Sequence, residues 1–266
     1  MLNNSRLDQI QRLINQNQRI SINEISQQFK ISVATARRDL DFLARHGKIQ
    51  RIHGGALIVQ KAPPEPPVLL RSNEQREEKE RIGAATAALI REGETVFLGS
   101  GTTVLEVAKR LPENKNLTIV SNSMLVINTL APRQDINLVI LGGIFHYSEY
   151  SAYGHLTELL IKEVFTDKVI FGIRALSIDH GLTNDFLPEI TTDQALLRIG
   201  KEIIIIADHT KFNRVSTASV GPISIVHKIV TDSLTPPEII HSLTLRGIEV
   251  IIAAPPALMI RKSGKI

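Results

Sequence analysis

A series of short, largely apolar runs separated by helix-forming segments restricts the fold of this 266-residue chain more than any other feature. The runs occupy residues 95–98, 117–120, 136–141, 168–173, 203–207, 228–230 and 249–253. Strands that are apolar on both faces are typical of parallel sheets with helices on each side. Residues from about 94 onward are therefore predicted to form a parallel α/β sheet, whose ligands bind at the carboxyl ends of its strands.

Glycine and polar residues follow the first three of these runs. They comprise Ser100, Gly101, Thr102, Thr103, Ser121, Asn122, Ser123, Gly142 and Gly143. Glycine lets a backbone approach an anion closely, and hydroxyl and N–H groups at a helix start donate hydrogen bonds to it. Ordinary turns and helix caps are the alternative explanation. The glycine–lysine spacing of a P-loop is absent, so a small phosphorylated ligand is favoured over a nucleoside triphosphate.

Two later segments border the same predicted crevice. Asp208 and Lys211 follow the run at 203–207. Lys211 can reach a phosphate or a sugar oxygen, and Asp208 can bind hydroxyls or orient Lys211, unless the two are only a helix cap and an exposed lysine. Asp179 and Gly181 lie in a predicted turn beside that crevice. The eight histidines have no metal-ligand spacing, so neither a metal nor a cofactor is predicted.

Four of the twelve prolines, at positions 63, 64, 66 and 67, divide the chain. A segment so rich in proline supports neither a helix nor a paired strand, and it acts as a semi-rigid spacer. The predicted organisation is a first domain at 1–60, a linker at 61–72, a second domain at 73–254 that begins with a helix over 73–90, and a tail at 255–266.

The positive charge of the chain lies in the predicted first domain. Residues 1–60 contain nine Lys/Arg and four Asp/Glu, whereas the rest of the chain is nearly neutral. Such an excess favours a polyanionic partner, nucleic acid before a membrane. No apolar run approaches the ~20 residues of a membrane span. Without cysteine the chain has no disulfide framework and no thiolate zinc site, and a reducing cytoplasm is its expected compartment.

Helical periodicity and capping residues predict three helices in residues 1–60. The first, at about 4–17, has an apolar face made of Leu7, Ile10, Leu13 and Ile14. Ser21 with Glu24 forms a capping box for a short second helix, and Ser32 caps a third. The third helix has an apolar stripe made of Val33, Ala36, Leu40 and Leu43. Two short strands, at 48–52 and 56–59, complete a winged helix-turn-helix.

The outward face of the third helix and the hairpin after it form the predicted DNA-binding surface. Small residues at a helix N-terminus allow close approach to the major groove, and arginine reaches guanine edges or phosphates. The residues predicted to contact DNA are Ser32, Ala34, Thr35, Arg37, Arg38, Lys48, Arg51 and His53. By themselves, the adjacent arginines are also compatible with a solvated helix face.

The segments 32–40, 47–49 and 51–56 resemble the DNA-binding signature of the DeoR-type bacterial transcription regulators, with Ala36 where the family usually has Ile. The resemblance continues in order to about residue 253, at 100–103, 120–123, 141–143, 167–168, 181–183, 208 with 211–212, and 231–232. It implies double-stranded operator DNA as partner and mostly repression of sugar-catabolism genes. It also implies a sugar phosphate as effector, and a second domain similar to the sugar-phosphate isomerase and CoA-transferase fold.

One departure from the family falls at the end of the run at 168–173. Where many members have a Gly-Ala-Asp-Gly-like segment, this chain has Arg174 within 172–176. Arg174 either adds a contact to an anionic ligand or pairs with a nearby acid. The resemblance therefore leaves the identity of the sugar open.

The sequence thus predicts a transcription regulator that is not an enzyme, in which a bound sugar phosphate changes operator affinity. Coupling through the linker and binding to paired half-sites both favour a homodimer or a larger homo-oligomer. The alternative is a sugar-phosphate isomerase or ring-opening deaminase with an accessory DNA module. Glu189 and Asp179 would then stand in for the acid or base that proton transfer needs. A structural DNA-binding protein without a ligand is a third hypothesis.

Overall fold

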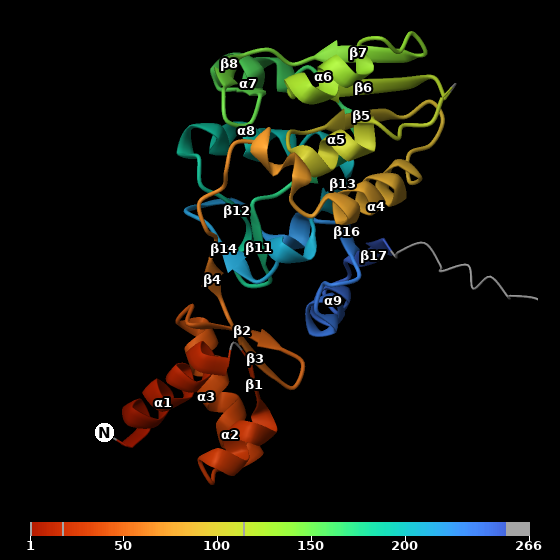
Figure 1. Cartoon of the computed structure of the whole chain (residues 1–266). Helices are drawn as coiled ribbons and strands as arrows, with labels where there is room; N and C mark the ends of the chain where they lie inside the picture. The colour runs from red at the N-terminus through yellow and green to blue at the C-terminus, as the bar shows by residue number, and fades with distance from the viewer. Residues whose placement is uncertain (1, 18, 114, 254–266) are drawn as a thin grey trace, which may run out of the picture.

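A winged helix and a large sheet lie at opposite ends of the molecule (Figure 1). The structure is a computed structural model that describes residues 2–17, 19–113 and 115–253. The chain passes from one end to the other through the proline-rich segment after residue 60. The tail expected at 255–266 lies outside the described residues.

The N-terminal end is a winged helix-turn-helix. Its elements are α1 (Leu2–Asn17), β1 (Arg19–Ser21), α2 (Ile22–Gln28), α3 (Val33–Arg45), β2 (Ile49–Ile52) and β3 (Gly55–Ile58). The predicted capping box is confirmed: the Ser21 side chain accepts from the Glu24 backbone N–H, and the Glu24 carboxylate accepts from the Ser21 backbone N–H. Ser32 caps α3 by accepting from the Thr35 N–H at 3.1 Å. The sequence did not predict β1, which joins the β2–β3 hairpin in the order β1-β3-β2.

The apolar core of the winged helix fixes which face of α3 points outward. Ala36 and Leu40 are fully buried in it, and Leu43 is 5% exposed. The predicted stripe is wrong at Val33, which is 40% exposed, because Val33 is the first residue of α3 and the core begins one turn later. Burial of this face leaves the opposite face of the first turns of α3 to the solvent.

The C-terminal end is built on a parallel sheet that has seven strands among the described residues. In spatial order these are β17 (Glu249–Ala253), β16 (Lys228–Asp232), β13 (Gly200–Ile206), β10 (Thr166–Gly172), β5 (Thr95–Leu98), β6 (Leu117–Ser121) and β7 (Ile136–Ile140). Every neighbouring pair is parallel, so the predicted parallel α/β sheet is confirmed. The strand order reverses between β5 and β10, and such a reversal leaves a crevice at the carboxyl ends of the strands.

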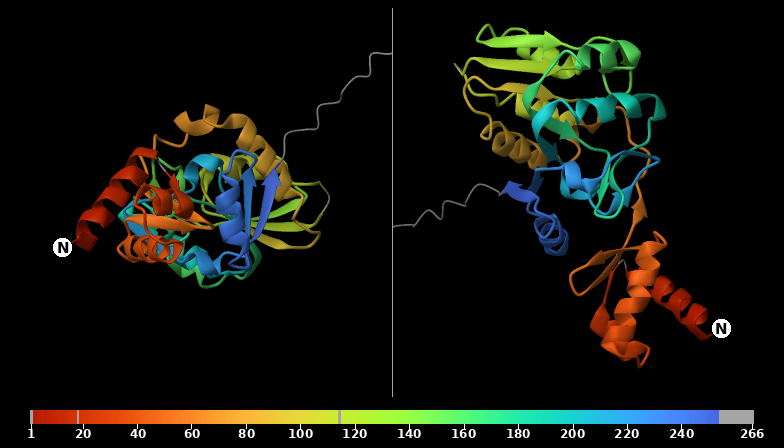
Figure 2. Two further views of the ribbon diagram at one scale, coloured as in Figure 1. Left: turned by 90° about the horizontal axis from the view of Figure 1, so that it is seen from below. Right: turned by 180° about the vertical axis from the view of Figure 1, so that it is seen from behind.

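Helices and a small sheet cover the two faces of this sheet (Figure 2). One face is covered by α4 (Arg76–Ala87), α5 (Thr102–Ala108) and α6 (Met124–Leu130). The other face is covered by α7 (His155–Ile161), α8 (Ile190–Leu196), α9 (Pro237–Thr244) and the antiparallel sheet of β11 (Ala175–Ser177), β12 (Gly181–Asn184) and β15 (Ala218–Gly221). A separate hairpin is formed by β8 (Ile144–His146) and β9 (Ser151–Tyr153).

The linker is bound to the C-terminal end more closely than the sequence suggests. The expectation that it pairs with no strand is wrong at Lys61, because β4 (Gln60–Lys61) pairs with β14 (Arg214–Val215). The pairing ends at Pro63, since proline has no N–H to donate. A short 3-10 helix, Leu70–Asn73, then precedes α4, so the helix predicted over 73–90 is shorter at both ends.

The winged helix also touches the C-terminal end directly. The Gln50 side-chain oxygen accepts from the Ile178 N–H at 3.3 Å. Arg19 forms an ion pair with Glu238 of α9 at 3.1 Å. The two ends of the molecule are therefore connected both by the linker and by contacts of the wing.

The packing of the sheet predicts that two phenylalanines contribute very differently to the free energy of unfolding. Phe97 is fully buried within β5, whereas Phe165 is 84% exposed. Phe97→Ala is expected to lower the free energy of unfolding by about 3–5 kcal/mol, because it removes buried apolar surface and leaves a cavity. Phe165→Ala is expected to change it by less than about 0.5 kcal/mol. Urea unfolding followed by circular dichroism measures both, and equal losses would contradict this packing.

Candidate functional site

A cavity of about 390 Å³ lies at the carboxyl ends of β5, β10 and β13, beside the point where the strand order reverses. It is lined by the loop at 100–103, by residues 171–174, and by Asp208 and Lys211. Its volume falls in the range of roughly 300–1,000 Å³ that is usual for small-molecule sites. The sheet therefore forms a ligand-sized crevice where the sequence places one.

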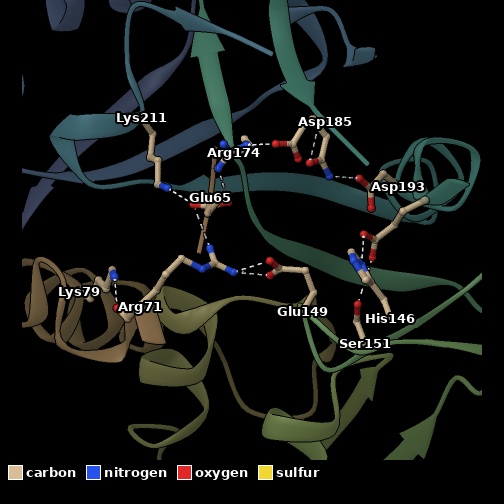
Figure 3. Close-up of polar contacts among 12 residues, drawn as sticks. Glu65, Arg71, Lys79, His146, Glu149, Ser151, Arg174, Asp185, Asp193 and Lys211 are labelled. Atoms are coloured by element: carbon tan, nitrogen blue, oxygen red, sulfur yellow. Dashed lines mark hydrogen bonds and ion pairs between the residues drawn. The ribbon is translucent and has the colours of Figure 1, made fainter. Parts of the chain in front are cut away.

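Glu65 of the linker lies inside this cavity among cationic side chains (Figure 3). Its carboxylate pairs with Arg71 at 3.0 Å and with Arg174 at 2.7 Å, and it also accepts from the Lys211 ammonium. The Arg71 and Arg174 side chains are only 9% and 5% exposed. Cations buried to this degree require an anion beside them, because an uncompensated buried charge is strongly destabilising.

The electrostatics of this cluster keep Glu65 charged. Burial acts to raise the pKa of Glu65, but Lys211, Arg71 and Arg174 outweigh burial and bring that pKa below its usual value. Lys79, on the same wall of the cavity, donates to the Arg71 carbonyl at 2.9 Å, and burial lowers the pKa of its ammonium. This end of the cavity therefore concentrates positive charge around a single linker carboxylate.

The other end of the cavity carries acidic side chains. Glu189 accepts from the Ser151 hydroxyl at 3.1 Å, and the His146 ring nitrogen lies 3.1 Å from its other oxygen. Asp193 accepts from the Asn184 amide at 2.9 Å. Burial, together with the nearby Glu189, raises the pKa of Asp193 well above its usual value, so its neutral form can also donate. Neighbouring donors and acceptors of this kind suit the hydroxyl groups of a polyol.

The structure brings some of the predicted effector-binding residues into the cavity and leaves others outside it. Those that line the cavity are Ser100, Gly101, Thr102, Thr103, Arg174, Asp208 and Lys211. Those that do not are Ser121, Asn122, Ser123, Gly142, Gly143, Asp179 and Gly181. Of the three loops expected to converge on a ligand, only the loop after β5 lines the cavity. Contact of any of these residues with a ligand stays a prediction.

The loops after β6 and β7 are engaged in the fold itself. The Ser121 hydroxyl donates to a carbonyl of β5 at 2.7 Å, and Ser123 caps α6. The Asn122 amide donates to a carbonyl of β9 at 2.8 Å. The Gly142 carbonyl accepts from the Thr157 hydroxyl of α7 at 2.8 Å, and Gly143 packs against the same side chain. Because β9 and α7 lie against these loops, most of their polar groups are already used, although the Asn122 side-chain oxygen is buried without a hydrogen-bond partner.

The turn between β11 and β12 approaches the winged helix instead of the cavity. A Cβ placed on Gly47 would lie 3.7 Å from the His180 ring, and Asp179 is exposed beside it. Gly181 has a φ of +69°, and a Cβ there would lie 2.3 Å from the Gly221 carbonyl oxygen. Glycine at 181 is thus explained by backbone geometry.

The predicted DNA-binding residues occupy α3 and the wing. Ser32, Ala34, Arg37, Arg38, Lys48 and His53 are exposed, and Thr35 and Arg51 are half-buried. Arg51 is held within the wing by an ion pair with Asp41 at 2.9 Å. The His53 ring lies 5.1 Å from the His241 ring of α9. The start of α3 therefore presents small residues and arginines to solvent, while two of the wing residues have contacts within the protein.

Sequence reasoning missed several charged residues of the cavity, namely Glu65, Arg71, Lys79 and Glu149. They belong to the linker, to the 3-10 helix after it, to α4 and to the loop between β8 and β9. None follows a strand of the large sheet, so a search of strand ends does not find them. The one signal for Glu65 is a lone charge between two proline pairs.

The described residues offer neither a metal centre nor a membrane span. Within them, no group of three or more His, Asp or Glu side chains is placed to hold a metal ion. A search of the same residues finds no helix both long enough and apolar enough to cross a membrane.

Comparison with known proteins decides the family. Residues 6–62 match the DeoR-like helix-turn-helix domain, and residues 74–233 match the DeoR C terminal sensor domain. The chain belongs to the DeoR family. The transcriptional repressor AccR of Agrobacterium fabrum is 36% identical over 224 residues, which cover 84% of this chain and 87% of that protein. The glycerol-3-phosphate regulon repressor of Escherichia coli is 33% identical over 238 residues, which cover 90% of this chain and 94% of that protein.

Membership of the DeoR family makes the chain a DNA-binding transcription regulator and not an enzyme. Among solved structures, ribose 5-phosphate isomerase A from Methanocaldococcus jannaschii matches with a TM-score of 0.40 and 15% identity, over 52% of this chain and 55% of that one. Asp179, one of the two residues that the enzyme alternative offered as the acid or base, does not line the cavity.

Two glycines predicted to bind the effector allow a matched test of their roles. Gly181→Ala is expected to lower the free energy of unfolding by about 2 kcal/mol or more, because the positive φ and the nearby carbonyl both oppose a Cβ. At Gly142 a Cβ would meet nothing within 4 Å, so Gly142→Ala is expected to cost less than about 0.5 kcal/mol. Thermal and urea unfolding measure both variants. A fully stable Gly181→Ala protein would show that the turn does not need glycine.

Proposed function

We propose that this chain represses an operon of carbohydrate metabolism and that a small phosphorylated sugar, bound in the cavity, is its effector. The observation that carries the proposal is the group of Arg71, Arg174 and Lys211 at the sheet edge of a chain that begins with a winged helix. The relatives named above are repressors, and one is named for a glycerol-3-phosphate regulon. Both facts support a repressor that responds to a phosphate ester.

The cationic end of the cavity suits a phosphate group. Arginine presents its N–H donors in a planar fork that matches phosphate oxygens, and lysine adds a compact charge. Arg71 and Arg174 are held in place by further ion pairs, with Glu149 and with Asp185 at 2.7 Å. Side chains that are already fixed lose little conformational freedom when a ligand binds. We therefore propose that the phosphate of the effector binds at this end.

The acidic end of the cavity suits the hydroxyl groups of the same ligand. Glu189 and Asp193 are almost fully buried, and His146 stacks on Phe186 with ring centroids 3.9 Å apart. A fixed set of donors and acceptors discriminates well between polyols, because a missing hydroxyl leaves a buried polar group without a partner. This end is proposed to select the sugar.

The exposed start of α3 is proposed to enter the major groove. Ala34 lets the helix approach the bases closely, and Arg37 and Arg38 are long enough to reach base edges or phosphates. A single winged helix contacts only one short half-site, and pairing two of them multiplies affinity. We therefore infer that the chain binds its operator as a homodimer or a larger homo-oligomer.

The DNA-binding proposal predicts the effect of removing one arginine. DNA is first selected from a random pool with the full-length chain, and affinity for the selected sequence is then measured by fluorescence anisotropy. Arg38→Ala is expected to weaken that binding by about 1–3 kcal/mol and to relax the preference at one base position. Arg91→Ala, which removes an exposed arginine from the C-terminal end, is the matched control and should leave affinity unchanged.

Two outcomes would count against this account of DNA binding. An equal loss on every sequence would make Arg38 a phosphate contact instead of a base contact. Failure of the unaltered chain to prefer any sequence over bulk DNA would contradict the proposed function itself.

The effector proposal predicts that one lysine controls the response to sugar phosphates. Triose, pentose and hexose phosphates are titrated into the complex of the chain with its selected DNA. Lys211→Gln is expected to raise the concentration needed for the response by about tenfold or more, because it removes a charge-assisted hydrogen bond. Lys201→Gln, at a side chain that is 81% exposed, is the control. A Lys211→Gln protein that responds like the unaltered chain would place the phosphate elsewhere.

A further inference from the structure

Glu65 holds the position in which an anionic ligand would be most stable. Its carboxylate contacts Arg71, Arg174 and Lys211 together, and its side chain is only 13% exposed. Glu149 pairs with Arg71 alone and Asp185 with Arg174 alone, so among the described residues only Glu65 has ion pairs with all three cations. The linker therefore supplies the one carboxylate that these cations share.

A phosphate monoester competes well for the same cations. It carries more negative charge than a carboxylate and has three acceptor oxygens in place of two. Glu65 and a phosphate cannot pair with the same N–H groups at once, since each donor hydrogen has one position. A phosphate that takes these N–H groups therefore requires the departure of Glu65 from them.

We propose that Glu65 is an internal competitor of the effector, so that a bound phosphate expels the linker carboxylate and releases the linker from the C-terminal end. The inference rests on the proposed function, because it takes a phosphorylated ligand as the occupant of this cavity. It adds the physical route by which that ligand acts on the rest of the chain.

The contacts on each side of Glu65 explain why its departure moves the linker. Before it, the Ala62 N–H donates to the Val215 carbonyl at 2.9 Å, and Arg174 donates to the Pro63 carbonyl. After it, the Val68 N–H donates to a carbonyl of the β8–β9 loop at 2.7 Å. The segment between these points contains four prolines and bends little. Arg174 holds both Glu65 and the Pro63 carbonyl, so a phosphate that takes Arg174 weakens two linker contacts together.

The energetic logic is a coupling between two equilibria. A ligand shifts a conformational equilibrium only by its difference in affinity for the two states. When Glu65 lies outside the cluster, the N–H groups that it occupied can bind a phosphate. When Glu65 lies inside, those groups are taken. By reciprocity, any change that expels Glu65 raises the affinity for phosphate.

The competing explanation is that Glu65 is a permanent structural partner of the cations and that ligands bind beside it. Under that explanation, removal of its charge destabilises the protein without improving anion binding. The competition therefore predicts tighter phosphate binding when the charge of Glu65 is removed, and the structural-partner explanation predicts no such increase.

The experiment titrates inorganic phosphate into the full-length chain and into Glu65→Gln by calorimetry, at an ionic strength held constant with chloride. Glu65→Gln is expected to bind phosphate about tenfold more tightly, because the N–H groups that the Glu65 carboxylate occupies become available. Glu74→Gln is the matched control: Glu74 also lines the cavity but is exposed. It removes the same charge and should tighten binding by less than about threefold, as expected for a screened long-range effect.

A second measurement uses the DNA selected with the unaltered chain. Without any ligand, the affinity of Glu65→Gln for this DNA should move in the same direction as that of the unaltered chain saturated with a sugar phosphate. If Glu65→Gln does not fold, Glu65→Asp takes its place, because a carboxylate that is one methylene shorter reaches the cations less well. This variant should then bind phosphate several-fold more tightly than the unaltered chain.

Each remaining outcome has one meaning. Equal phosphate affinity of the unaltered chain and the Glu65 variant would overturn the competition and leave the proposed function intact. A control variant that tightens binding as much as Glu65→Gln would also overturn it, since the effect would then be one of overall charge. If phosphate bound to no variant, the competition and the proposed effector class would both be wrong.

Discussion

The need to neutralise buried positive charge governs the relation between the two ends of this molecule. Arg71, Arg174 and Lys211 lie close together, and the two arginines are almost completely removed from water. Such a group is stable only with an anion among its members, because like charges repel strongly where water cannot screen them. The chain supplies Glu65 from the segment that leads to the winged helix. Glu149 and Asp185 add one further ion pair each, to Arg71 and to Arg174. The proposed ligand site and the connection between the two ends therefore share one set of charges.

The parallel sheet explains how residues far apart in the chain reach this point. β5, β10 and β13 are neighbours in the sheet, and each ends at the same edge. The loop at 100–103, Arg174 and Lys211 follow these strands, so the sheet order alone brings them together. The reversal of strand order between β5 and β10 sends the following helices to opposite faces and leaves the edge between them uncovered.

The sequence predicts the part of the site that follows from strand ends and fails for the part that does not. Arg174 and Lys211 could be placed because Arg174 directly follows the run at 168–173 and Lys211 comes four residues after the end of the run at 203–207. Ser121 and Gly142 follow such runs too, but β9 and α7 come from a region without a clear apolar pattern and pack against both loops. Glu65 could not be placed, because its position depends on the linker folding back onto the sheet. The proline content predicts that the linker is stiff, but it does not predict the direction in which the linker runs.

Two connections join the winged helix to the C-terminal end: the direct contacts of the winged helix and the linker. The winged helix touches the C-terminal end through Leu57, which packs against the core there, and through the His53–His241 ring contact and a few polar contacts. Its ion pair between Arg19 and Glu238 is exposed and so contributes little. The Gln50 amide nitrogen at this contact is buried without a hydrogen-bond partner, which makes the contact weaker still. The linker, by contrast, is held by strand pairing and by the buried charges around Glu65. The linker connection is the one that passes through the proposed ligand cavity. Under the proposed competition with Glu65, an anion in that cavity acts on the linker connection.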